Sequence, residues 1–350
     1  MGSGLYFHKV GQMSATRVWI NNPTRLQAKK AIEAGACGCT ANPAYLSKIL
    51  YDQVEGEYVR DIIRELVPTE NDDLKLLEEL QRRVVKGLAD LFYPVYKDSK
   101  GKNGFVSIQG DPFNETEENI VEYALKNHAM APNITPKIPF VKESFGAVEK
   151  LLQNDVPLNI TEVMSVHQYY DLMTVYNSVR EEKGAMPEVF CSHILGIFNE
   201  YLKEYVKENE IDIDENILAQ AGSIIAKKLV EIGQQYSSPI RWISGGARTL
   251  TDFTGLVGSN MNITINWPGA FEVLLEEEPL IVEAFKQPVP VLVLDELLEK
   301  VVEFKRGYMV NGLTAEEYDD YGPVVKFRKS FQKGWNIALE EISKIRSEMN

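Results

Sequence analysis

The chain has 350 residues, 44% of them hydrophobic and 25% charged, and its formal net charge is −14. This is an ordinary globular balance, sufficient to fill a large core. A surface that binds nucleic acid or an anionic membrane needs a concentrated basic face, and no block of Lys or Arg stands out here. Composition therefore argues against both kinds of partner, whereas a few local cations could still hold an anionic small substrate.

The start of the chain and the cysteines indicate the compartment. The opening MGSGLYFHKVGQMS lacks the apolar core of a signal peptide, and no run approaches the length of a membrane span. Cys37, Cys39 and Cys191 are an odd number of thiols, which is typical of reduced, buried cysteines. The first two lie too close in sequence for the usual zinc pair. We therefore expect a cytoplasmic protein with neither a metal nor another cofactor.

Short apolar runs alternate along the chain with longer helical patterns, and this alternation predicts parallel strands joined by helices. The predicted strands cover residues 17–21, 36–40, 104–109, 133–137, 157–161, 188–192, 240–244 and 262–266. Helical patterns cover residues 24–34, 115–128, 142–154, 166–180, 213–233 and 268–286. These units predict a single α/β domain over residues 1–350, a closed (β/α)8 TIM barrel.

Two regions exceed a minimal barrel. Residues 51–103 form a charged helical insertion after the second strand, and residues 290–350 form a helical C-terminal extension. Charge-rich segments of this kind are usually solvated faces and less often subunit contacts. A homo-oligomer is therefore left open.

Side chains alternate between the two faces of a strand, and one face is polar in several of the predicted strands. Its members are Asn133, Thr135 and Lys137, then Asn159 and Thr161, then Asn262, Thr264 and Asn266. The intervening residues are mainly isoleucine and leucine, which suits contact with the outer helices. The polar set should then face the barrel axis, with its C-terminal members at the mouth where barrel enzymes work. The alternative is a hydrogen-bonded network without chemistry.

Lys137 is the most informative member of this set. An ammonium inside a barrel is costly to desolvate, so its pKa should fall and leave neutral amine. A neutral amine can attack a ketone, and the resulting iminium draws electrons from the adjacent carbon–carbon bond. Lys137 is therefore a candidate Schiff-base nucleophile, the alternative being a strand-end lysine that extends to solvent.

Several motifs share the order and strand positions of those in transaldolases, which the chain resembles over residues 17–345. They are Thr40-Ala41-Asn42-Pro43, Pro136-Lys137-Ile138-Pro139, Asn159-Ile160-Thr161, Gln168, Ser192 with Gly196, Gly245-Gly246-Ala247-Arg248 and the segment Gly312–Tyr318. The resemblance implies transfer of a dihydroxyacetone unit between sugars or sugar phosphates, as in the pentose phosphate pathway, through a Schiff base on Lys137. It also implies that Thr161 helps to hold a catalytic water, and that Asn42, Asn159 and Ser192 bind the sugar.

The family's acidic residues are replaced here. The strand-1 aspartate is Asn21 and the strand-3 glutamate is Gln109, and the resemblance places both residues with Lys137 and Thr161 in the catalytic set. An amide keeps the shape of a carboxyl group but cannot act as a base near neutral pH. With fewer anions nearby, Lys137 should be more readily neutral. His193 and Asp111 could replace the missing acid–base function, or could be exposed loop residues.

The family's phosphate site is also depleted. Its strand-6 arginine is Ile197 and its strand-7 serine is Gly246, which leaves Arg248 to bind an anion, with Arg241 as a helper from the same strand. A sugar without phosphate is thus an alternative substrate. Three functions stay open: a transaldolase-like transferase, a Schiff-base aldolase or lyase acting on another or a non-phosphorylated sugar, and an inactive barrel used as a sugar sensor or structural protein.

Overall fold

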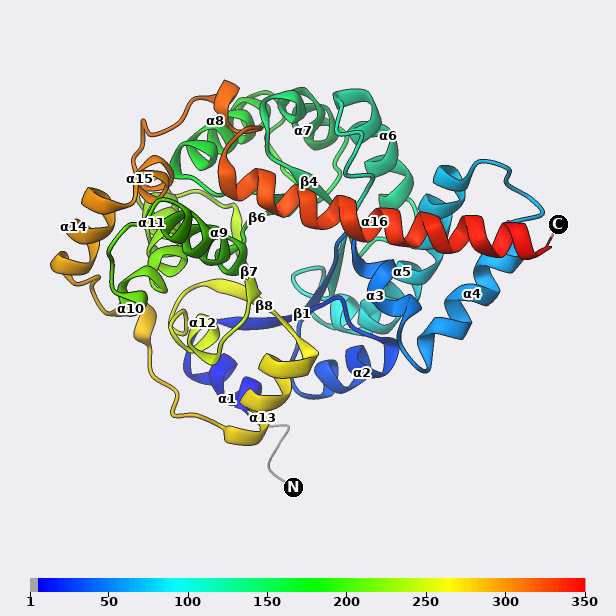
Figure 1. Ribbon diagram of the computed structural model, residues 1–350, viewed down its shortest axis with the longest axis horizontal. Coiled ribbons are helices and arrows are strands. Elements are labelled where there is room, and N and C mark those ends of the chain that lie inside the picture. The colour runs from blue at the N-terminus through cyan, green and yellow to red at the C-terminus, as the bar shows by residue number, and fades with distance from the viewer. Residues whose placement is uncertain (1–5, 350) are drawn as a thin grey trace.

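The computed structural model describes residues 6–349, in which eight parallel strands close into a barrel in sequence order (Figure 1). All eight predicted strands are confirmed, with ends displaced by no more than three residues. The (β/α)8 barrel is thereby confirmed as well. The strands are β1 (Arg17–Asn21), β2 (Gly38–Ala41), β3 (Phe105–Gln109), β4 (Ile134–Pro139), β5 (Leu158–Thr161), β6 (Val189–His193), β7 (Arg241–Ala247) and β8 (Met261–Asn266).

Helices surround the barrel, and most of them follow the predicted ranges. They include α2 (Arg25–Glu33), α5 (Asp73–Asp98), α6 (Glu117–His128), α7 (Phe145–Gln153), α8 (Val166–Lys183), α9 (Leu195–Glu208) and α11 (Ala221–Gln235). The helix predicted over 213–233 is two helices, α10 (Glu215–Leu218) and α11. The helix predicted over 268–286 is wrong over most of its length, and α13 (Glu272–Glu277) is its α-helical part. Gly269 at φ 88° and Glu278 at φ 40° interrupt the helical backbone on either side.

Side chains fill the barrel interior in layers. At the amino-terminal end Trp19, Phe105 and Phe190 pack edge to face. Gly38 makes room for this layer, because a Cβ on it would lie 2.2 Å from the Trp19 ring. Above the aromatic layer, hydroxyl and amide groups of Ser107, Thr135, Asn159 and Ser192 are joined by hydrogen bonds of 2.6–2.9 Å. The interior thus becomes polar toward the carboxyl-terminal mouth.

Asn133 does not belong to this polar interior. Its Nδ2 donates to the carbonyl oxygens of Ala89 on α5 and Gly104, both at 2.9 Å. The prediction that its side chain faces the axis is therefore wrong, because Asn133 precedes β4 and anchors the outer helix. The apolar residues Ile134, Ile138, Leu158, Ile160, Ile263 and Ile265 do pack in the hydrophobic core.

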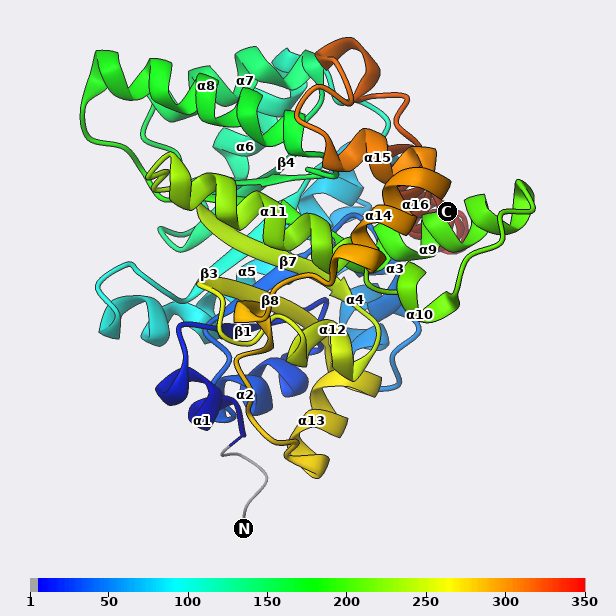
Figure 2. The same cartoon turned by 90° about the vertical axis from the view of Figure 1, so that its left-hand side faces the viewer.

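The two additional regions pack onto this frame. The helices α3 (Tyr45–Leu50) and α4 (Glu55–Leu66) precede α5, which packs against β2, β3 and α2 in the manner of a barrel helix. The C-terminal region contributes α14 (Val291–Lys300), α15 (Val302–Tyr308) and α16 (Gly322–Met349). Figure 1 shows α16 crossing the end of the barrel, from the side of α9 to that of α4 and α5. In Figure 2 the strands point toward the side where α16 lies, so this helix covers the mouth.

Charged and polar side chains fix α16 in this position. Arg328 donates to Glu115 Oε2 at 3.0 Å and to Asp319 Oδ1 at 2.5 Å, and Gln332 donates to the carbonyl oxygen of Pro112 at 3.1 Å. The helix is thereby bound to the loop after β3. Over residues 6–349, no helix is both long enough and apolar enough to span a bilayer.

Candidate active site at the barrel mouth

Lys137 lies on β4 between two polar neighbours in register. Gln109 of β3 is paired with it on one side and Asn159 of β5 on the other. The side chain is buried, and its Nζ lies 5.3 Å from the ring centroid of Phe327 and 5.5 Å from that of Phe331, both on α16. The C-terminal extension therefore supplies the aromatic cover over the amine.

Burial sets the protonation of Lys137. Loss of hydration disfavours the ammonium and lowers the pKa to about 8, although the negative charge of Glu162 works in the opposite direction. The ammonium also lies close enough to two aromatic faces for a cation–π attraction, which offsets part of the desolvation. The site thus holds an amine that loses its proton much more readily than an ordinary lysine.

Asn21 is held rigidly at the end of β1. Its Nδ2 donates to Asn266 Oδ1 at 2.9 Å, and its Oδ1 accepts from Thr40 Oγ1 at 2.8 Å. Thr40 in turn lies 3.0 Å from Thr264 Oγ1. Both ends of the amide are therefore used in a network that joins β1, β2 and β8.

Buried polar atoms without partners gather around the strand of Lys137. Gln109 Oε1, Thr161 Oγ1 and Glu162 Oε2 all lack a hydrogen-bond partner within the described part of the chain. Leaving such an atom unsatisfied costs ~1–3 kcal/mol, so groups of them usually mark a place for water or ligand. Gln109 and Thr161, both candidates for the catalytic set, thus have free hydrogen-bonding capacity on the two strands that flank Lys137.

Glu162 is a site residue that the sequence analysis did not identify. Strand alternation after Asn159 and Thr161 would turn it outward against the helices. Its buried carboxylate instead reaches the Gln109 side chain, and its Oε1 accepts from Gln109 Nε2 at 3.3 Å. The reason is its φ of 63°, a left-handed conformation that ends the alternation. The sequence did offer one signal for Glu162, because its carboxylate directly precedes the apolar residues Val163 and Met164.

The predicted sugar-binding residues line the same mouth. Asn42 and Ser192 border a cavity of about 50 Å³ together with Lys137 and Asn21. Asn159 lies deeper, donating to Ser107 and accepting from Ser192 Oγ at 2.6 Å. A cavity of this size holds on the order of three or four water molecules. A six-carbon sugar therefore requires displacement of part of the lining, of which Phe327 on α16 is one member.

Arg248 also borders this cavity, but its charge is compensated. Its Nε donates to Glu200 Oε1 of α9 at 2.9 Å, and both side chains are about two-fifths exposed. Ile194 and Ile197 form an apolar wall beside it. The close approach of the start of α9 to β7 also requires Gly196, because a Cβ there would lie 1.8 Å from the Gly246 carbonyl oxygen.

Arg241 does not assist Arg248. It begins β7, at the amino-terminal end of the barrel, where it pairs with Glu188 at 3.3 Å and lies over the Phe190 ring. The prediction of a helper role was wrong because the two arginines occupy opposite ends of one strand.

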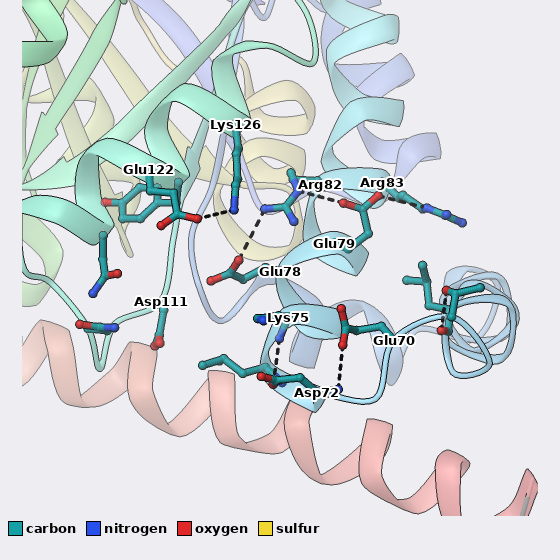
Figure 3. A pocket seen from close by; sticks show the side chains of 16 residues that line it. Glu70, Asp72, Lys75, Glu78, Glu79, Arg82, Arg83, Asp111, Glu122 and Lys126 are labelled. Atoms are coloured by element: carbon teal, nitrogen blue, oxygen red, sulfur yellow. Dashed lines mark hydrogen bonds and ion pairs between the residues drawn. The ribbon is translucent and has the colours of Figure 1, made fainter.

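His193 and Asp111 do not face Lys137 either. The His193 ring is buried between the carbonyl oxygens of Val163 at 3.0 Å and Gly222 at 3.1 Å, and burial lowers its pKa to about 4. Figure 3 shows Asp111 at a surface pocket between α5 and α6, where pairs such as Lys126–Glu122 compensate one another's charge. Asp111 accepts from the Phe113 backbone N–H at 2.9 Å. Both residues have structural roles.

Gln168 fixes the loops beside the site. Its Nε2 donates to the carbonyl oxygens of Phe140 at 2.8 Å and Glu162 at 3.0 Å, while its Oε1 accepts from the Met164 and Ser165 backbone N–H groups. It thus ties the ends of β4 and β5 together and holds the turn that directs Glu162 inward.

The cysteines are free and buried, as predicted. Burial raises the pKa of the Cys37 thiol to about 11 and also raises those of the other two thiols. Within residues 6–349, His, Cys, Asp and Glu side chains form no group of three or more that could hold a metal ion.

Comparison with known proteins identifies a family whose model matches most of the chain. A family model described as transaldolase/fructose-6-phosphate aldolase matches residues 18–278. A transaldolase of Saccharopolyspora erythraea is 25% identical over 214 residues, which cover 59% of this chain and 56% of that protein. A transaldolase of Trichodesmium erythraeum is 27% identical over 181 residues, covering 49% and 47%. A transaldolase 2 of a Nostoc species is 29% identical over 171 residues, covering 45% and 43%. The chain thus spans about half the length of the curated relatives that it matches.

Proposed function

This chain belongs to the transaldolase/fructose-6-phosphate aldolase family, and from that premise we propose that it is a Schiff-base enzyme that transfers a dihydroxyacetone unit between sugars through Lys137. The observation that carries the proposal is a buried lysine at the barrel mouth, covered by Phe327 and Phe331 and flanked by unsatisfied polar atoms. A role in pentose phosphate metabolism would follow from this activity.

The lowered pKa of Lys137 supplies the nucleophile. At a pKa of about 8, roughly a tenth of the molecules carry a neutral amine at pH 7, compared with less than ~0.1% for an ordinary lysine. The neutral amine attacks the ketone carbon of the donor and forms a carbinolamine, which loses water to give an iminium. The iminium then accepts the electron pair of the adjacent carbon–carbon bond when that bond breaks.

Polar groups around Lys137 suit a polyol. Asn42 and Ser192 border the cavity, and Thr161 offers a hydroxyl without a protein partner. Each buried hydroxyl of a sugar needs a hydrogen-bond partner, and such groups supply them. In this assignment Thr161 holds the water that hydrolyses the iminium, and Asn159 positions Ser192 beneath the sugar.

A second candidate function is aldol cleavage of a ketose without phosphate. Two observations favour it: Arg248 is paired with Glu200, and Ile197 presents an apolar side chain to the same cavity. An acidic partner weakens the attraction of an arginine for a phosphate group, and an apolar wall provides no further donors. The Schiff base on Lys137 is common to both candidates, which differ in the substrate.

Borohydride trapping tests the shared step. The protein is incubated with dihydroxyacetone or fructose 6-phosphate, reduced, and analysed by intact-mass and peptide mass spectrometry. We expect a stable adduct on Lys137, absent from a Lys137→Met variant and retained in Lys142→Met, in which an exposed lysine is replaced. If a folded protein gives no adduct with either ketose, the enzymatic proposal fails and a sugar-sensing or structural barrel becomes the better explanation.

A further inference from the structure

Glu162 occupies a constrained position directly after β5. Its left-handed backbone, at φ 63°, is uncommon for a residue with a side chain and is maintained by the bond from Gln168 Nε2 to its carbonyl oxygen at 3.0 Å. This conformation directs a fully buried carboxyl group toward the strands that flank Lys137. Constrained residues of this kind occur preferentially at functional sites.

The carboxyl group is only half satisfied. Its Oε1 accepts from Gln109 Nε2 at 3.3 Å, whereas its Oε2 has no partner within residues 6–349. Thr161 Oγ1, on the preceding residue, and Gln109 Oε1 are also unpartnered. The ends of β3 and β5, the two strands that flank Lys137, therefore present three free hydrogen-bonding atoms, as a hydroxyl or water between them would require.

Several charged and titratable groups influence Glu162 from the elements around it. Burial raises its pKa, and the positive charges of Arg328 and Lys137 and the Gln109 hydrogen bond act against this. Asp319, Glu115 and Tyr123 are the other titratable groups close to it. Burial thus moves the pKa values of Glu162 and Lys137 toward each other, which suits the exchange of a proton near neutral pH.

The other candidates for this task are occupied elsewhere. Asn21 is an amide with both ends hydrogen-bonded, His193 lies between two backbone carbonyl groups, and Asp111 faces a surface pocket. Glu162 is the carboxyl group whose charge acts directly on Lys137.

We propose that Glu162 is the proton-transfer group of this site, a role that rests on the Schiff-base function proposed above. As the neutral acid it donates its proton to the carbinolamine hydroxyl, which leaves as water while the nitrogen lone pair forms the iminium bond. The resulting carboxylate then accepts the proton of the hydroxyl on the β-carbon. As that proton leaves, the O–H electrons form the aldehyde carbonyl, the carbon–carbon bond breaks, and its electron pair passes into the iminium to give an enamine.

The test compares the rate of borohydride trapping by dihydroxyacetone in the parent protein, Glu162→Gln and Glu162→Asp. Gln keeps the shape and the contact with Gln109, but its amide cannot transfer a proton as an acid, so trapping should slow by ~100-fold. Asp keeps the acid on a shorter side chain, so a loss of roughly tenfold is expected, with the pH dependence of the parent retained. Glu303→Gln is the matched control, because Glu303 is a buried carboxylate paired with Arg306 away from the mouth, and its trapping rate should be unchanged.

The outcomes separate the two proposals. If the parent is trapped and Glu162→Gln is trapped within threefold of the same rate, Glu162 does not transfer the proton and the inference is overturned, while the Schiff-base function stands. If the parent gives no adduct on Lys137, both proposals fail. If Glu162→Gln fails to fold, the Glu162→Asp variant decides the question. Trapping at the rate of the parent with an altered pH profile contradicts the inference. Slower trapping with the pH profile of the parent supports it.

Discussion

Lys137 Nζ and the ring centroid of Phe327 lie 5.3 Å apart, although the two residues are separated by half the chain. The helix that carries Phe327 is held over the barrel mouth by Arg328, which pairs with Glu115 at 3.0 Å. The C-terminal extension is therefore part of the site, because it excludes water from the amine. Its aromatic residues should control the protonation of Lys137.

The first prediction concerns pH. Only the neutral amine reacts, and Glu162 must hold its proton to act as the acid. The trapping rate of the parent should therefore rise about tenfold per pH unit below the Lys137 pKa of about 8 while Glu162 stays protonated, and should fall where Glu162 ionises. Phe327→Ala admits water, so the pKa should return part of the way toward its ordinary value. We expect the midpoint to move up by ~0.5–1 unit and trapping at pH 7 to fall ~3–10-fold.

Phe285→Ala serves as the control for this prediction, because Phe285 lies 5.7 Å from Lys227 Nζ in a comparable contact outside the mouth. Its midpoint should match that of the parent. An unchanged midpoint in Phe327→Ala would contradict the view that α16 desolvates the amine.

The second prediction is that Lys137→Met stabilises the folded protein at neutral pH. The folded-state pKa of Lys137 is lowered by burial, so stability is lost as the pH falls from the unfolded-state value through the folded-state value. Replacing the amine removes this cost, and the free energy of unfolding at pH 7 should rise by ~2 kcal/mol. Urea unfolding at pH 7 and pH 10 measures this change in the free energy of unfolding.

The gain from Lys137→Met should shrink at pH 10, because the lysine is then neutral in the folded state and already partly neutral in the unfolded state. Lys142→Met, at a half-exposed position, should leave stability nearly unchanged at both pH values. A Lys137→Met variant less stable than the parent at pH 7 would show that the ammonium is well compensated in its site.

The third prediction concerns phosphate. Glu200→Gln removes the acidic partner of Arg248, so the KM for a phosphorylated ketose should fall ~3–5-fold, the effect of an exposed ion pair, while dihydroxyacetone trapping should not change. Glu204→Gln on the same helix, which breaks the contact with Lys326, is the control. If Glu200→Gln changed the KM for the phosphorylated ketose and the trapping of dihydroxyacetone to the same extent, Arg248 would not be the group that binds phosphate.

The fourth prediction tests the residue at the end of β1. Asn21→Asp places a carboxylate at the mouth, and the Asn266 amide can turn to donate to it. If Glu162 already transfers the proton, turnover of the parent should change by less than ~threefold. In the Glu162→Gln background the same substitution should restore at least ~tenfold of the lost rate. If Asn21→Asp instead raised turnover greatly in the parent, with Glu162 still present, the parent would lack a residue that transfers the proton.

Much of the fold could be predicted because strands and helices bury their side chains with different periods. The alternation around Lys137, with Thr135 on its face and isoleucines on the other, predicted both the strand and the inward direction of the amine. The broken helix over 268–286 was missed because left-handed backbone at Gly269 and Glu278 interrupts an otherwise suitable pattern.

The site could be predicted only where its residues follow strand alternation. Asn21, Gln109 and Thr161 do so, and their places at the mouth are those expected. Glu162 does not, because a left-handed φ held by Gln168 turns it inward. A single backbone conformation thus decided whether this carboxyl group faces the helices or the lysine.

The sequence by itself determined the barrel, the strand that carries Lys137 and the polar character of its interior, since periodic burial is a local property of the chain. Only the tertiary structure decided that Phe327 covers the amine, that Glu200 pairs with Arg248 and that Arg241 lies at the opposite end of the barrel. These relationships join segments far apart in sequence, or the two ends of one strand. They depend on how the closed barrel orients its strands and packs its outer helices, which no local pattern encodes.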